Sequence, residues 1–263
     1  MDLGLKDKVA LVAASSTGLG RAVAEELANE GAALILCARN EERLKATADA
    51  IQQNTGARVL SVRADVTDRS DIDNLIAAGR EKFGHIDILV TNAGGPPAGR
   101  FDQLSREQWE DAARLTLFSS IELARAVLPG MKQQRWGRIL NITSIAVKQP
   151  VDSLMLSNSL RAAVTGFART LANEVATDGI TVNNILPGYT RTERVEELAQ
   201  QMGEKLGMTP DEFKKKWEQE IPMRRLGEPR EFAALAAFLV SERAAYITGT
   251  SIQVDGGWIR SLL

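Results

Sequence analysis

The sequence is poor in the residues that build metal centres and disulfides, because it contains one cysteine and one histidine. Cys37 cannot form an intrachain disulfide, which is typical of proteins in a reducing compartment. Its place in the apolar run 32–37 predicts a buried, unreactive thiol. A single histidine excludes a metal site built from several histidines, and His85 is interpreted as a surface turn residue ahead of a strand. We expect no metal site.

A strong net charge and long hydrophobic runs are also absent. The chain has 32 lysine and arginine residues and 34 aspartate and glutamate residues, a formal net charge of −2, and both signs are spread along it. No basic block indicates nucleic acid and no basic amphipathic stripe indicates a membrane surface. The apolar run 9–14 is too short for a signal peptide or a membrane span. We expect a cytoplasmic protein that binds neither nucleic acid nor membranes.

Short apolar runs rich in valine, isoleucine and leucine alternate with longer helical patterns. Such runs suit strands that are buried on both faces, as parallel sheets require. Repeated strand–helix alternation predicts right-handed crossovers with helices on both faces of the sheet. The sequence therefore predicts an α/β fold, a single Rossmann-type doubly wound domain over residues 1–263 with about seven parallel strands. The runs are residues 9–14, 32–37, 58–62, 86–90, 137–142, 180–185 and 250–254.

One highly charged segment, residues 189–227, interrupts this alternation just before the last helix and strand. Its pattern predicts two short amphipathic helices at about 193–204 and 210–220. Thr209 and Glu212 form a capping-box pattern at the start of the second helix. An excursion at this place is typical of a segment that covers a site, so we expect it to act as a lid.

A loop containing two glycines follows the first apolar run and leads straight into a helical pattern. Closely spaced glycines let backbone N–H groups approach a diphosphate, and the helix N-terminus adds partial positive charge. A tight turn without a ligand is the alternative, but the position after the first strand of an alternating fold favours a dinucleotide site. The loop residues are Ser15, Ser16, Thr17, Gly18, Leu19 and Gly20.

This loop resembles the glycine motif of the short-chain dehydrogenase/reductase family, Thr-Gly-x-x-x-Gly-x-Gly, which falls on residues 13–20. Gly18 and Gly20 match the motif, whereas Ala13 and Ala14 depart from it. The first motif glycine makes a sharp turn, and an alanine is comfortable there only with a negative φ. We therefore expect a slightly altered turn.

The resemblance continues along the whole chain, with further motifs in the family's order. It implies three more groups of cofactor contacts, at the adenine, at the sheet beside the cofactor, and along the nicotinamide with a threonine on its carboxamide. In that order the residues are Asp65 and Val66, then Asn92, Ala93 and Gly94, then Pro187, Gly188 and Thr192.

The end of the second strand bears on the choice of cofactor. An acidic residue there would bind a ribose 2′-hydroxyl and repel a 2′-phosphate. This chain instead has Arg39, whose planar guanidinium can donate two hydrogen bonds to a phosphate. Family members with arginine at this position generally prefer NADP(H), so the resemblance implies NADP(H) in preference to NAD(H). The alternative is that Arg39 stacks on adenine or lies in solvent. Thr17 offers no charge at a second phosphate-contact position that is basic in some relatives.

The resemblance also marks the catalytic positions, and most of them are changed. The family uses a tyrosine that passes a proton to the carbonyl, a lysine that lowers the tyrosine pKa and binds ribose, a serine that positions the carbonyl, and an asparagine. Ser144 fills the serine position, but Ser157 replaces the tyrosine, Arg161 the lysine and Thr116 the asparagine. A serine hydroxyl is a much weaker acid than a phenol. Arg161 can still bind ribose hydroxyls, but it stays protonated, so the usual mechanism cannot be carried over.

Few other side chains offer a substitute acid. Tyr189 directly follows the nicotinamide segment and is interpreted as a residue that lines the pocket, with a role as the acid as the less favoured alternative. Tyr246 is interpreted as a packing residue before the last strand. Lys148 and Asp152 lie on the loop after the fifth strand and are interpreted as solvated charges, with substrate contact as the alternative.

Three functions are compatible with these residues, and the first two are favoured. The first is an NADP(H)-dependent oxidoreductase similar to the 3-oxoacyl-(acyl carrier protein) reductases, acting on a carbonyl or hydroxyl of a small-molecule or acyl substrate with non-standard proton delivery. The second is an inactive dinucleotide-binding protein that serves as a sensor or as an oligomer partner of an active relative. A less favoured third is a lyase or isomerase with a structural cofactor.

Two long helices offer surfaces for self-association. A capping-box pattern at Ser105 and Gln108 opens a helix that extends toward Leu128, and a second long helix is expected at residues 158–177. The resemblance implies a homo-oligomer, either a tetramer or a dimer, built through these helices and the last strand.

Overall fold

The computed structural model describes residues 1–262 and contains one sheet of seven parallel strands in the order β3-β2-β1-β4-β5-β6-β7. The predicted strands are confirmed, with bounds that move by only a few residues. The direction of winding reverses between β1 and β4, which is where parallel α/β sheets bind ligands. The strands are β1 (Val9–Val12), β2 (Ala33–Ala38), β3 (Val59–Arg63), β4 (Ile88–Thr91), β5 (Gly137–Ile142), β6 (Ile180–Pro187) and β7 (Ser251–Val254).

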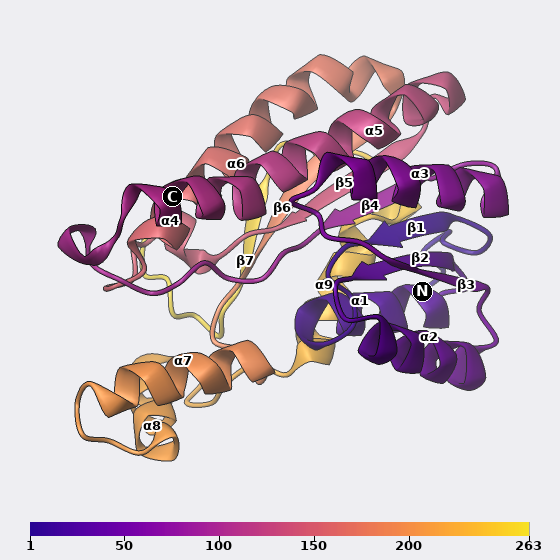
Figure 1. Cartoon of the computed structure of the whole chain (residues 1–263). Helices are drawn as coiled ribbons and strands as arrows, with labels where there is room; N and C mark the ends of the chain where they lie inside the picture. The colour runs from indigo at the N-terminus through magenta and orange to yellow at the C-terminus, as the bar shows by residue number, and fades with distance from the viewer. Residues whose placement is uncertain (263) are drawn as a thin grey trace.

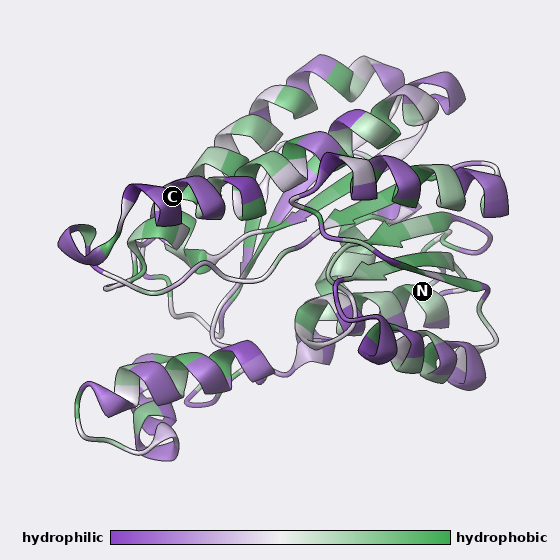
Figure 2. Cartoon of the chain, viewed as in Figure 1, coloured by the Kyte–Doolittle hydropathy of each residue, from purple (hydrophilic) through white to green (hydrophobic). Residues whose placement is uncertain are grey.

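Helices cover both faces of this sheet, as predicted (Figure 1). One face carries α1, α2 and α9, and the other carries α3, α5 and α6 with α4 packed against α6. Figure 2 shows hydrophobic strands between helices whose outer faces are hydrophilic. The helices are α1 (Gly18–Asn29), α2 (Glu41–Thr55), α3 (Arg69–Phe83), α4 (Arg106–Ala113), α5 (Ser119–Gln134), α6 (Met155–Val175) and α9 (Pro229–Leu239).

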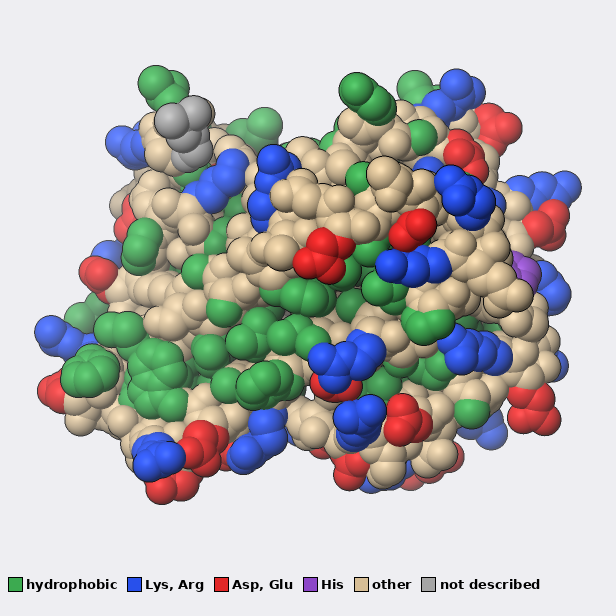
Figure 3. All heavy atoms as spheres, turned by 90° about the horizontal axis from the view of Figure 1, so that it is seen from above, with side chains coloured by type: hydrophobic (Ala, Val, Ile, Leu, Met, Phe, Trp, Pro, Cys, Tyr) green, Lys and Arg blue, Asp and Glu red, His purple; other side chains and the backbone are tan. Residues whose placement is uncertain are grey.

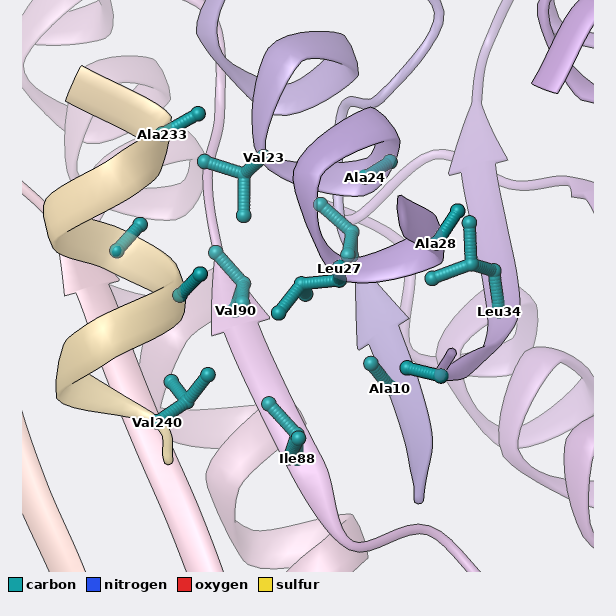
Figure 4. Close-up of a cluster of buried hydrophobic side chains, with 14 of the residues drawn as sticks. Ala10, Val23, Ala24, Leu27, Ala28, Leu34, Ile88, Val90, Ala233 and Val240 are labelled. Carbon is teal, nitrogen blue, oxygen red and sulfur yellow. The ribbon is translucent and has the colours of Figure 1, made fainter. Parts of the chain in front are cut away.

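The packing of α1 fixes the loop that precedes it. Val23 and Leu27 project from α1 onto the strands and lie beside Val90 of β4, with α9 on their other side (Figure 4). Leu27 is fully buried, and burial of a leucine side chain contributes about 1.5–3 kcal/mol. Since α1 begins at Gly18, this packing holds the glycine loop against the end of β1.

The long helix predicted from Ser105 toward Leu128 is interrupted by one wider turn. Its capping box is confirmed, but α4 and α5 are joined by a π-helical turn over Arg114–Phe118. The Ser119 and Ser120 hydroxyls donate to the carbonyls of Leu115 and Thr116 at 2.5 and 3.1 Å. Such side-chain bonds compete with the regular helical bonds and disturb a helix locally.

The two helices predicted in the charged excursion are confirmed as α7 (Glu193–Glu204) and α8 (Pro210–Glu220). They stand apart from the helical layers (Figure 1). Trp217 of α8 packs with Leu186 of β6 and Trp258 near the C-terminus in a separate hydrophobic cluster. The excursion is therefore fastened to the sheet through aromatic side chains. Within residues 1–262, no helix has the length and apolar character that crossing a bilayer requires.

Two predictions about single residues have opposite outcomes. Cys37 is fully buried, as predicted, and burial raises the pKa of its thiol to about 12. The packing role given to Tyr246 is wrong, because its side chain is fully exposed, with a relative accessibility of 103%. Ala244, two residues earlier, fills the buried position instead.

Candidate functional site

A cavity of about 930 Å³ lies at the carboxyl ends of the strands and is lined by the segments that follow β1, β2, β3, β4, β5 and β6. These segments are distant in sequence but meet because parallel strands end at one edge of the sheet. Most of the residues marked by the sequence line this cavity. They are Ser16, Thr17, Gly18, Leu19, Arg39, Asp65, Val66, Asn92, Ala93, Gly94, Ser144, Ser157, Arg161, Pro187, Gly188 and Thr192.

Ser15 and Gly20 hold the glycine loop from behind instead of lining the cavity. Ser15 is fully buried, and its N–H donates to the Cys37 carbonyl at 3.1 Å. A Cβ at Gly20 would lie 2.4 Å from the Ala14 carbonyl oxygen and 2.9 Å from Asn92 Nδ2. The Asn92 amide donates to that same oxygen at 3.3 Å. Glycine at position 20 therefore allows α1 to start close against the end of β1.

Ala14 adopts a left-handed backbone conformation with φ of +48°. Ala14 does not have the negative φ that a residue with a Cβ prefers. The first position of the turn keeps a positive φ instead. For a residue with a Cβ this conformation costs about 1–2 kcal/mol. Gly18 has a φ of +59°, which glycine adopts without that penalty. The loop therefore contains one strained residue at Ala14.

Arg39 and Asn40 line the cavity where β2 ends. The Asn40 side chain caps α2 by accepting from the backbone N–H of Arg43 at 2.9 Å. The Arg43 side chain reaches across to α7 and donates to Glu193 at 2.5 Å. These two residues are 150 positions apart, and nothing in the sequence indicated their contact. The ion pair joins the charged excursion to the helix that follows Arg39.

Ser144 and Ser157 face the cavity from the end of β5 and from the first turn of α6. The Ser144 oxygen accepts the N–H of Ala146 at 3.1 Å. Its hydroxyl hydrogen is then available to a ligand, since a hydroxyl is both donor and acceptor. The structure brings the two serines to one site, as the sequence spacing predicts, although Ser157 lacks the reach of a tyrosine.

Arg161 is fastened to the end of β5. Its Nη1 donates to the carbonyls of Ile142 and Thr143 at 3.0 and 2.8 Å. Burial lowers the pKa of Arg161 to about 10, and the positive charge of Arg194 acts in the same direction. Arg161 is therefore still protonated at neutral pH and cannot relay a proton.

A second, small cavity of about 10 Å³ lies behind this arginine. It is lined in part by Thr116 and Thr143, whose side-chain oxygens are buried and have no hydrogen-bond partner within residues 1–262. A cavity of this size holds about one water molecule. The space lies where the π-helical turn places Thr116, the residue that replaces the family's asparagine.

Tyr189 lines the large cavity, as predicted, and is held by aromatic neighbours. Its ring stacks on Trp217 at a centroid distance of 4.4 Å and meets Trp258 edge-on at 5.9 Å. Burial raises the pKa of Tyr189 above that of an ordinary phenol, and the charges of Glu220 and Asp152 raise it further. The phenol is therefore a weaker acid than usual, which fits a lining role.

The two loop charges do not line the cavity in the structure. The Lys148 ammonium donates to Gln253 of β7 at 2.8 Å, so it is bound and not simply solvated. Asp152 is exposed, as predicted.

Arg194, like Glu193 and Glu197 near it, lines the cavity although sequence reasoning missed it. It lies in the first turn of α7, and its Nη2 donates to the Pro96 carbonyl at 2.9 Å. A Cβ at Gly95 would lie 2.7 Å from Arg194 Nε, so the guanidinium rests directly on the Gly95 backbone. In sequence, an arginine on a highly charged amphipathic helix looks like a surface residue, and no local pattern distinguishes it.

Comparisons with known proteins cover almost the whole chain. The family model described as enoyl-(acyl carrier protein) reductase matches residues 13–259. The 3-oxoacyl-[acyl-carrier-protein] reductase of Haemophilus influenzae is 37% identical over 253 residues, which are 96% of this chain and 98% of that protein. The Escherichia coli reductase of the same description is 34% identical over 255 residues, 97% of this chain and 98% of that protein.

Solved structures agree with these matches. L-sorbose reductase from Gluconobacter frateurii, in complex with NADPH and L-sorbose, superposes with a TM-score of 0.95 at 36% identity, with full coverage of both chains. An actinorhodin polyketide ketoreductase with NADPH gives a TM-score of 0.93 at 31% identity, covering 97% of this chain and 98% of that one. With its sheet order, its glycine loop and these relatives, the chain belongs to the short-chain dehydrogenase/reductase family of oxidoreductases, and within it resembles the 3-oxoacyl-(acyl carrier protein) reductases.

Proposed function

We propose that this protein is an NADP(H)-dependent oxidoreductase that interconverts a carbonyl and a hydroxyl with a non-standard source of the proton. The observation that carries the proposal is that the expected dinucleotide contacts, from six separate segments, line one cavity with Ser144. The residues fit the cofactor, because glycines at the loop allow close backbone approach and α1 begins at that loop.

The preference for NADP(H) rests on Arg39. It lines the cavity at the end of β2, where a 2′-phosphate would lie beside the adenosine ribose, and its fork can bind a phosphate in a bidentate manner. The relatives solved with NADPH support the same choice.

A nicotinamide bound in this cavity would supply or accept a hydride. The Ser144 hydroxyl donates to the substrate carbonyl, because its oxygen already accepts the N–H of Ala146. Ser157 is shorter than a tyrosine and leaves space beside Ser144 for an ordered water that delivers the proton. Arg161 orients the ribose and stays charged throughout.

The second candidate is a dinucleotide-binding protein without turnover, acting as a sensor or as the partner of an active relative. The observation that favours it is that none of the expected proton donors is a good acid. Ser157 has only a weakly acidic aliphatic hydroxyl, Arg161 is fixed to two carbonyls, and the pKa of Tyr189 is raised.

The experiment that separates them measures NADPH binding by fluorescence and NADPH oxidation with a panel of ketones, aldehydes and 3-oxoacyl thioesters. The proposal expects tight NADPH binding, weaker NADH binding, and turnover of a carbonyl in the panel. Binding without turnover would favour the second candidate, and no binding of either dinucleotide would refute both.

A double variant tests the site geometry independently. Ser157→Tyr with Arg161→Lys should create or raise reductase activity if only the acid is missing. The matched control is Ser159→Tyr with Arg161→Lys, because Ser159 lies on the same helix but is exposed outside the cavity. Equal activity of the two variants would contradict the assigned position of Ser157.

A homo-oligomer is proposed as the assembly. The face seen from above in Figure 1, formed by the long helices, carries a band of hydrophobic side chains (Figure 3). Phe118, at the junction of α4 and α5, is 51% exposed. Small-angle scattering and sizing should give the mass of a dimer or tetramer, and Phe118→Glu should weaken the assembly.

A further inference from the structure

Two arginines from different layers of the fold line the cavity, and the charge of Arg194 is close enough to act on Arg161. Arg161 comes from α6 and Arg194 from the start of α7, and each uses only some of its donors within the protein. Nη1 of Arg161 donates to two carbonyls. Nη2 of Arg194 donates to the Pro96 carbonyl, and its Nη1 forms an ion pair with Glu197 at 3.5 Å. Nε and one hydrogen of Nη2 of Arg161 can bind one carboxylate, and the second Nη2 hydrogen remains for the ribose; neither nitrogen has a partner within residues 1–262.

The positive charge of Arg161 is not balanced by the protein. Within residues 1–262, no acidic side chain forms an ion pair with it, although the cavity wall contains three carboxylates. Glu193 is paired with Arg43, and Glu197 is 61% exposed and lies 3.5 Å from Arg194. Asp65 accepts from the backbone and hydroxyl of Thr67 at 2.9 and 2.8 Å. Buried charges are normally paired, so a second cation beside Arg161 marks a place for an anion.

The glycine loop, where a cofactor diphosphate would bind, packs against Thr192. A Cβ at Gly18 would be 3.7 Å from Thr192 Cγ2, which places Thr192 over the glycine loop. Arg194 points away from that loop, to Gly95 and Pro96 at the end of β4. Arg161 holds the carbonyl of Thr143, the residue next to Ser144. The anion position is therefore on the Ser144 side of the cavity, where substrate would lie.

The structure points to a carboxylate on the substrate: we infer that the substrate is a short oxo acid, or the matching hydroxy acid, whose carboxylate lies between Arg161 and Arg194 while its carbonyl faces Ser144. A planar carboxylate matches the fork of donors on a guanidinium. Apolar side chains on the cavity wall, among them Leu115, Val151 and Leu154, would receive the hydrocarbon part. This inference rests on the proposed redox function and adds the substrate class to it.

The test compares acids with esters of the same skeleton. NADPH oxidation is measured with pyruvate, 2-oxobutyrate and 3-oxobutyrate and with their methyl esters. Wild type should prefer the acids in kcat/KM by about 10- to 100-fold, the factor that a hydrogen bond to a charged group provides. Equal rates for acids and esters, or faster turnover of 3-oxoacyl thioesters, would overturn the inference.

Two variants at the start of the charged excursion test whether Arg194 causes the preference for acids over esters. Arg194→Gln should lose most of the acid preference. Arg191→Gln should keep it, because Arg191 pairs with Glu228 at 3.0 Å and Glu218 at 3.5 Å and does not line the cavity. If Arg194→Gln keeps the preference and instead weakens NADPH binding about 10-fold or more, the guanidinium serves the cofactor diphosphate and the inference fails.

Calorimetry separates this inference from the redox proposal. If no carbonyl is reduced, the redox proposal fails. The anion site is then tested on its own by titrating pyruvate into the protein saturated with NADP⁺. Heat of binding in wild type that is lost in Arg194→Gln would support the anion site by itself. No heat in wild type would refute it.

Discussion

The strained alanine in the glycine loop gives a prediction whose sign depends on one backbone angle. Ala14 has a φ of +48°, and the left-handed conformation costs a residue with a Cβ about 1–2 kcal/mol. Glycine removes that cost but gives the unfolded chain more freedom, which lowers stability by about 0.4–1 kcal/mol. Ala14→Gly should therefore raise the free energy of unfolding by about 0.5–1 kcal/mol, the difference between these two ranges.

The assay is chemical and thermal unfolding of wild type, Ala14→Gly and Ala13→Gly under identical conditions. Ala13 precedes Ala14 but is not among the residues with positive φ, and it is fully buried. Ala13→Gly should therefore lower stability, since it adds chain freedom and removes a packed methyl group. Opposite signs for the two neighbours would support the strained turn. If Ala14→Gly destabilises the protein as Ala13→Gly does, the reasoning from φ is refuted.

The remaining predictions concern other parts of the chain. Gly20→Ala should weaken NADPH binding and lower the unfolding midpoint together, because its Cβ would lie 2.4 Å from the Ala14 carbonyl oxygen; a folded variant with unchanged NADPH affinity would contradict the close approach. Leu27→Ala should lower the free energy of unfolding by about 2–5 kcal/mol, since Leu27 is fully buried, and denaturant titration measures the loss. Arg43→Gln and Glu193→Gln break a half-exposed ion pair, so a double-mutant cycle should give a coupling of about 0.2–1 kcal/mol. Burial raises the pKa of the Cys37 thiol to about 12, so above the unfolded pKa of about 8.5 the native state keeps a proton that the unfolded state loses. The free energy of unfolding should then fall from about pH 8.5 to about pH 12, and the fall should be smaller in Cys37→Ala.

The strands and the two helices of the charged excursion could be predicted because their signals are local. A buried parallel strand needs a run of apolar residues, and α8 begins at a capping box that Thr209 and Glu212, three positions apart, define. The sequence also predicted that distant motifs meet in one cavity, because the carboxyl ends of parallel strands lie at the same edge of the sheet. The π-helical turn at Arg114–Phe118 did not follow, since serine hydroxyls do not reveal in sequence which carbonyl they will bind.

Contacts between distant charged residues were beyond sequence reasoning. Arg194 and Pro96 are 98 positions apart, and Arg43 and Glu193 are 150 apart. All three charged residues lie in segments that look like solvated helix surface. Only the placement of the first turn of α7 on the cavity wall makes Arg194 a candidate ligand-binding residue. The sign of φ at Ala14 is a similar case, because sequence identifies the missing glycine but not whether the turn adapts to its loss.

The changes at positions 157 and 161 are best understood together. In the family pattern the lysine lowers the pKa of the tyrosine, so once Ser157 stands in that position there is no phenol left to tune. Arg161 is permanently charged and no longer has to lower the pKa of a phenol, so it can be fixed to the carbonyls of Ile142 and Thr143. Its remaining donors can bind an anion. It follows that Ser157→Tyr alone should restore little activity, because its phenol would face a side chain that cannot join a proton relay. Activity in the single variant equal to that of the double variant with Arg161→Lys would show that the two positions act independently.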